Sequence, residues 1–236
     1  MIPDFSPIFA RYEALVREVD AVFARVDQAC PGCVKCKPGC SDCCHALFDL
    51  SLVEAMYLNH QFKIRYGFGP ERSAILASAA KTDRDLTVLK RDYYRSARER
   101  GKLAVTEEQA HDVVQNVMEK AAHDRVRCPL LNDKDTCLLY DVRPITCRMY
   151  GIPSAIEGKA YVCGQSGFDL GKGYPTVKMD KIQDRLDEMS HDIQKLCKSR
   201  FKELHTVFTP VSMALLTNYD ETYLGIGPAP AESKEF

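Results

Sequence analysis

Six cysteines lie within one short stretch of this chain, CPGCVKCKPGCSDCC. Its first four follow the spacing C-x2-C-x2-C-x3-C, which lets a tight loop fold several thiolates around one iron–sulfur cluster. Gaps of two residues also suit zinc, which takes four thiolates in a tetrahedron. The spacing therefore predicts a metal centre and leaves the metal open. The candidate ligands of this stretch are Cys30, Cys33, Cys36, Cys40, Cys43 and Cys44.

A second group of cysteines follows about eighty residues later, at Cys128, Cys137, Cys147 and Cys163. The gaps between them are too wide for one tight loop. The fold must gather these four thiols, or pair them with the thiols of the first stretch. We therefore expect the two segments to meet in space as two halves of one metal-binding region.

Two arginines, Arg143 and Arg148, flank Cys147 and are candidates for a supporting role around the cofactor. Cationic neighbours lower the pKa of a thiol and offset the negative charge of a thiolate-bound cluster. The alternative is that both arginines form ion pairs with nearby carboxylates, for which the sequence offers Asp133, Asp135 and Asp141.

The meaning of four residues, Cys43, Cys44, His45 and Cys197, is less specific. Adjacent Cys43 and Cys44 would point to opposite sides of an extended chain and could then serve two centres; the alternative is that one is a small core residue. His45 is a ligand, a donor to a ligand or a solvated side chain. Cys197 lies on the apolar side of a C-terminal helix, which predicts a core thiol.

Composition favours metal binding over disulfides. The 236 residues include eleven cysteines, below the ~8–10% typical of a disulfide scaffold. The start, MIPDFSPIFARYE, lacks the pattern of a signal peptide, and no apolar run approaches the ~18 residues of a membrane span. We therefore expect a cytoplasmic protein without a membrane, where thiols stay reduced. A net charge of −1 does not favour nucleic acid as a partner.

Hydrophobic periodicity predicts a mostly α protein, a single helical domain with two irregular cysteine-rich metal-binding loops. We expect one domain over residues 1–224, with its core motif at 30–163, and a mobile tail over 225–236. A capping box of Ser51 and Glu54 marks one helix start, and Thr106 with Gln109 marks another. The expected helices cover 8–26, the segment from Ser51 to Gly67, 71–101, 106–123 and about 178–204.

The motifs CKPGCSDCC, LFDLSLVEAMYL, CPLL and YDVRPITCRMYG, over roughly residues 36–163, resemble the CxxCxxCC cysteine-cluster family. These YkgJ-like proteins are described as zinc- or iron-chelating, and a similar cysteine domain occurs in flagellin lysine N-methylases. The resemblance implies eight ligand candidates and no particular reaction. They are Cys36, Cys40, Cys43, Cys44, Cys128, Cys137, Cys147 and Cys163, to which this chain adds Cys30 and Cys33.

Eight to ten thiolates are enough for two [4Fe–4S] clusters, or for one larger iron–sulfur cluster. We therefore expect a redox or electron-transfer protein that works with a redox partner protein. The alternatives are a zinc-stabilised interaction module, a metal chaperone or store, and an iron–sulfur component of a methylase-like, protein-modifying system. Whether the chain is an enzyme, its oligomeric state, and whether Cys30 and Cys33 are ligands or a redox-active thiol pair stay open.

Overall fold

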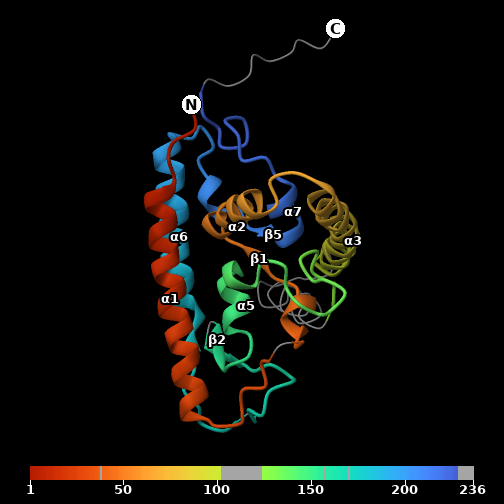
Figure 1. Cartoon of the computed structure of the whole chain (residues 1–236), viewed down its shortest axis with the longest axis vertical. Coiled ribbons are helices and arrows are strands. Elements are labelled where there is room, and N and C mark those ends of the chain that lie inside the picture. The colour runs from red at the N-terminus through yellow and green to blue at the C-terminus, as the bar shows by residue number, and fades with distance from the viewer. Residues whose placement is uncertain (38, 102–123, 157, 170, 228–236) are drawn as a thin grey trace.

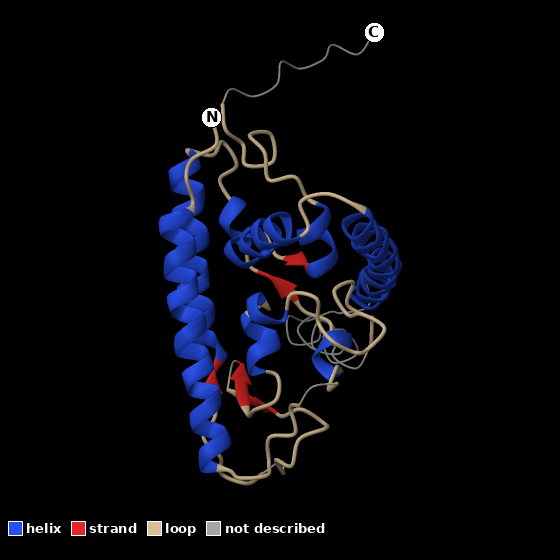
Figure 2. Ribbon diagram, viewed as in Figure 1, coloured by secondary structure: helices blue, strands red, loops and turns tan. Residues whose placement is uncertain are grey.

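The computed structural model describes residues 1–37, 39–101, 124–156, 158–169 and 171–227. Helices dominate these residues and strands are few and short, so the prediction of a mostly α fold is confirmed (Figure 2). The helix expected over 106–123 lies outside the described residues. The single domain over 1–224 stays a prediction. No helix in the described ranges combines the length and apolarity that crossing a membrane requires.

Two long helices, α1 (Ser6–Ala29) and α6 (Met179–Cys197), run side by side along one edge of the molecule (Figure 1). The stripe that predicted α1 is the face it buries, with Tyr12, Leu15 and Val19 almost fully enclosed. The helix expected to reach residue 204 ends at Cys197. The reason is local: Lys198 adopts a left-handed conformation, φ 46°, and its N–H closes the last turn.

The second layer is built on α2 (Leu52–Arg65), which begins at the predicted capping box. Its neighbours are α3 (Pro70–Gly101) and α7 (Val211–Leu216), and a two-stranded antiparallel ladder, β1 (Asp49–Leu50) with β5 (Thr209–Pro210), lies beside them. The second hydrophobic cluster, with Leu58, Phe62 and Ala79 at its centre, holds these elements together. The sequence did not predict α7, β1 or β5.

The cysteine segments are irregular, as expected, but short elements interrupt them. The first segment contains a 3-10 turn, η1 (Asp42–His45). The second contains η2 (Tyr140–Val142), α5 (Ile145–Met149) and the hairpin of β2 (Ser154–Ile156) and β3 (Lys159–Tyr161), with β4 (Val177–Lys178) parallel to β2. A last turn, η3 (Leu204–Thr206), follows α6.

Residues 225–227, expected to begin the tail, are part of the fold. The carbonyl of Gly225 accepts the Arg200 N–H at 3.0 Å. Ile226 packs against the first hydrophobic cluster, whose buried members include Tyr12, Leu15 and Ile193. The mobile tail expected over 225–236 stays a prediction, and residues 228–236 lie outside the described residues.

Candidate metal centre

Eight of the ten candidate cysteines line two adjoining cavities. The large cavity has a volume of about 300 Å³ and the small cavity about 170 Å³. They share Cys43, Cys44, Cys137 and Cys147 in their walls, together with Arg143. Cys128 belongs to the large cavity alone, whereas Cys36, Cys40 and Cys163 belong to the small cavity alone. The two cysteine segments, about eighty residues apart in the chain, thus meet as the sequence predicts.

We group these thiols into two sets by the cavities that they line and by the thiols that lie near them. The Cys36 set consists of Cys36, Cys40 and Cys163, whose thiols interact with one another. The Cys128 set consists of Cys44, Cys128, Cys137 and Cys147. Cys43 interacts with members of both sets and lies at their junction.

Cys43 and Cys44 do not lie on extended chain, which corrects the geometric premise of the sequence argument. Both belong to the 3-10 turn η1, and both line both cavities. Strand alternation therefore gives no support to the hypothesis that Cys43 and Cys44 serve two centres. What supports it is that Cys43 lies near thiols of both sets.

Backbone hydrogen bonds join the two cysteine segments directly. The N–H of Cys128 donates to the Cys44 carbonyl at 2.7 Å, and the N–H of Val126 donates to the His45 carbonyl at 3.0 Å. A further bridge between Leu131 and Cys137 folds the second segment back on itself. These bonds fix Cys44, Cys128 and Cys137 within one small region of backbone.

Helix α5 presents Cys147 and is anchored on two sides. Arg148, 6% exposed, donates to both carboxylate oxygens of Asp20 on α1, at 2.7 and 3.0 Å, and to the Arg143 carbonyl at 2.9 Å. The N–H of Ile145 donates to the buried carboxylate of Glu54 on α2 at 3.1 Å. The alternative weighed for Arg148, an ion pair with a carboxylate, is present, but its partner is Asp20, which is distant in sequence, and not Asp133, Asp135 or Asp141.

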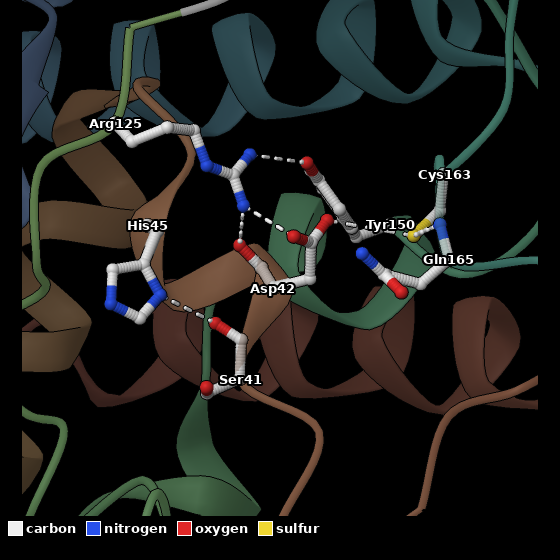
Figure 3. A network of polar contacts seen from close by, with 7 residues as sticks. All are labelled: Ser41, Asp42, His45, Arg125, Tyr150, Cys163 and Gln165. Carbon is white, nitrogen blue, oxygen red and sulfur yellow. Dashed lines mark hydrogen bonds and ion pairs between the residues drawn. The ribbon is translucent and has the colours of Figure 1, made fainter.

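Cys163 lines the small cavity and belongs to a network of polar contacts (Figure 3). The Cys163 thiol donates to Asp42 at 3.6 Å, and the N–H of Gln165 donates to the Cys163 sulfur at 3.4 Å. Arg125 forms an ion pair with Asp42 and donates to the Tyr150 hydroxyl at 3.2 Å. Sequence reasoning missed Asp42, although it lies inside the CSDCC motif, and gave no signal for Arg125.

His45 turns toward its own segment in the same view. One of its ring nitrogens, Nδ1, lies 3.1 Å from the Ser41 carbonyl oxygen (Figure 3). This local contact stabilises η1. The part of the chain that the structure describes gives no contact from His45 to a thiol.

Burial governs the protonation of most of these thiols. Loss of hydration raises the pKa of Cys128 to about 12 and also raises the pKa of Cys137 and Cys163. It raises the pKa of Cys36 to about 11 as well, because the sulfur packs inward against Gly151 although the residue as a whole is exposed. Cys43 is the exception, because the neighbouring Cys147 and Cys44 thiols favour its charged form and lower its pKa.

Arg143 lies where the cavities adjoin, and its Nε–H is buried without a hydrogen-bond partner among the described residues. Its guanidinium stacks on the Tyr140 ring, 4.0 Å from the ring centroid. A buried N–H without an acceptor is costly, so such a group commonly indicates a partner that the protein atoms do not supply. Arg143 thus combines a place in the wall of both cavities with a buried N–H that no described protein atom accepts.

The other cysteines lie elsewhere. Neither Cys30 nor Cys33 is among the described residues that line the two cavities. Cys197 is 4% exposed in the first hydrophobic cluster, so its prediction as a core thiol is confirmed. Within the described ranges, no three histidine, cysteine or acidic side chains converge closely enough to hold a single metal ion.

Comparison with protein-family models, curated proteins and solved structures found no match to this chain. Membership of the CxxCxxCC cysteine-cluster family therefore stays a prediction from the motifs, and so does the cytoplasmic location.

Proposed function

We propose that this chain is an iron–sulfur protein that holds two [4Fe–4S] clusters and transfers electrons to or from a redox partner protein. The observation that carries the proposal is the gathering of eight thiols around two adjoining cavities with the unpaired Nε–H of Arg143 between them. A [4Fe–4S] cluster takes four cysteine ligands, so eight thiols match two clusters.

The two thiol sets suggest how the ligands divide. The Cys128 set already contains four cysteines, and the Cys36 set reaches four when Cys43 joins it. Each cavity would then receive one complete ligand set. This division gives a role to all eight cysteines that line the cavities.

Hydrogen-bond donors around the thiols also fit sulfur-rich clusters. Reduction potentials of such clusters depend on hydrogen bonds to their sulfurs and on solvent exposure. The N–H of Gln165 already donates to the Cys163 sulfur. Arg143 contributes a positive charge at the junction and a free Nε–H, both suited to a negatively charged cluster.

A single zinc ion fits this arrangement less well. Zinc draws four ligands around one point, at about 2.3 Å for thiolate sulfur. In the part of the chain that the structure describes, no three candidate side chains converge in that manner, whereas the thiols surround two spaces. The arrangement therefore favours cofactors of several atoms.

When bound, the clusters would supply one-electron redox chemistry. The protein side chains would shield the clusters from water, balance their charge and hold their ligands. Leu130 and Phe48 line the large cavity and exclude water, Arg143 offsets charge, and the anchors of α5 fix Cys147. Cys36 is exposed, so the Cys36 set lies nearer to solvent and marks the side from which an electron-transfer partner would approach.

Paired cysteine variants test the proposal. Cys163→Ser removes a ligand of the Cys36 set, Cys128→Ser removes a ligand of the Cys128 set, and Cys197→Ser is the matched control in the core. After anaerobic purification, we expect each of the first two variants to lose iron, sulfide and about half of the visible absorbance, since each disturbs one of two four-cysteine clusters. The control should retain wild-type values.

The outcome of these variants is decisive in both directions. If Cys163→Ser and Cys128→Ser kept wild-type iron and sulfide, the two-cluster proposal would be abandoned. If all three variants contained zinc and no sulfide, the chain would be a zinc-stabilised module.

A further inference from the structure

Cys30 and Cys33 form a structural unit of their own at the end of α1. Cys30 is the C-cap of that helix, and its N–H donates to the Val26 carbonyl at 3.0 Å. Both cysteines are partly exposed and pack against the edge of the first hydrophobic cluster. They belong to neither thiol set, so their chemistry needs a separate explanation.

The intervening Pro31 and Gly32 fold the two cysteines into a tight turn. The N–H of Cys33 donates to the Cys30 carbonyl at 3.1 Å, and Gly32 has a φ of +76°. Proline followed by glycine with positive φ is the preference of a type II turn. In a β-turn the first and fourth Cα atoms lie less than about 7 Å apart, which overlaps the ~4.4–6.8 Å range of disulfides.

Contacts with Gly167, in the segment after Cys163, hold this turn in place. The Cys33 carbonyl accepts the N–H of Gly167 at 2.8 Å, and a Cβ at Gly167 would lie 3.2 Å from the Cys33 Cα. Pro31 and Gly32 are exposed, so an outside molecule can reach the turn.

We propose that Cys30 and Cys33 are a thiol–disulfide exchange site whose partner is a thiol/disulfide couple. One thiolate attacks a sulfur of the partner disulfide and releases one partner thiol. The other cysteine then attacks the mixed disulfide, which closes the Cys30–Cys33 bond and releases the second partner thiol. The dithiol loses two electrons and two protons, and the partner disulfide gains both. This proposal does not depend on the identity of the metal.

A redox titration of the full chain, as purified anaerobically, tests the exchange site. The protein is equilibrated with reduced and oxidised glutathione at several ratios, quenched with an alkylating reagent and mapped by mass spectrometry. We expect a Cys30–Cys33 disulfide whose oxidised-to-reduced ratio follows [GSSG]/[GSH]². Two results would overturn the proposal: both cysteines alkylated at every ratio, or either cysteine paired with a different cysteine of the chain.

Two variants separate an exchange site from a ligand pair. In Cys33→Ser, the remaining Cys30 should accumulate as a mixed disulfide that follows [GSSG]/[GSH], whereas Cys197→Ser should titrate like the wild type. The double variant Cys30→Ser/Cys33→Ser should retain the metal and sulfide content of the wild type. A loss of metal in the double variant would make the two cysteines ligands and contradict the exchange site.

Discussion

Single residues set the detail of the proposed centre, and Gly151 shows how closely its atoms pack. The Cys36 sulfur lies directly over Gly151, so that a side chain at this position would overlap the sulfur. Gly151 is buried and immediately follows Tyr150, the hydroxyl partner of Arg125. The glycine is therefore explained by the space that the Cys36 sulfur occupies.

The first prediction concerns this contact. Gly151→Ala should displace the Cys36 sulfur and lower the iron content from about eight to about four per chain, because only the cluster of the Cys36 set is disturbed. Gly164→Ala is the matched control, since a Cβ there meets nothing within 4 Å. Iron per chain and visible absorbance, measured for both variants and the wild type, test this prediction. Equal iron in both variants would show that Cys36 is not a ligand.

At the scale of elements, the short helix α5 depends on its neighbours. A helix of five residues has little stability alone, so tertiary contacts must hold it. Arg148 ties it to α1, and Glu54 ties its first turn to α2. The position of Cys147 therefore follows from two polar contacts that cross between elements.

The ion pair between Arg148 and Asp20 gives the second prediction. Arg148 is buried whereas Asp20 is 46% exposed, so Asp20→Ala should reduce the free energy of unfolding by about 1.5–3 kcal/mol, the range for hydrogen bonds to charged groups. Glu18→Ala breaks an ion pair with Arg185 that is exposed at both ends, so solvent screening should leave the free energy of unfolding almost unchanged. The free energies of unfolding of the two variants and the wild type are compared by urea unfolding at matched metal content. A smaller loss for Asp20→Ala than for Glu18→Ala would contradict the anchoring role.

Glu54 gives the third prediction, on pH. Burial raises the pKa of this carboxyl above its ordinary value of 4.5, against hydrogen bonds from Ile145 and Ser51 that lower it. The charged form is thus the costly one in the folded state. As the pH falls from neutral through the raised pKa toward 4.5, the folded protein takes up the proton first and this residue's contribution to stability increases.

Glu54→Gln should remove that part of the pH dependence, because the amide does not titrate. Urea unfolding midpoints of wild type and variant, measured from neutral pH down toward 4.5, should therefore change with different slopes, with the wild type gaining relative to the variant. Glu71→Gln, an exposed position at the start of α3, should follow the wild type. Parallel slopes for wild type and Glu54→Gln would contradict the prediction.

At the scale of the whole molecule, the sequence predicted the long elements and the meeting of the cysteine segments. The apolar stripe of α1 and the capping box of α2 are local patterns, and both are present. The contacts that build the centre are not local. Asp20 with Arg148 and Glu54 with Ile145 join positions far apart in the chain, and no spacing in the sequence indicates them.

The C-terminal end of α6 could not be predicted from the sequence pattern either. Apolar residues continue the helical pattern as far as Leu204, yet the left-handed Lys198 ends the helix and Leu204 returns to the core through η3. The pattern identified a buried residue correctly and its secondary structure incorrectly. The spacing of apolar residues indicates which side chains are buried, and a buried side chain can belong to a helix or to a turn that follows it.

The measurement that tests the central claim most directly is iron, acid-labile sulfide and zinc per chain after strictly anaerobic purification, with absorbance and EPR spectra of the same sample. Two [4Fe–4S] clusters predict about eight iron and eight sulfide per chain, and an EPR signal that appears or disappears on reduction. Stoichiometric zinc, no sulfide and a flat visible spectrum would contradict the account.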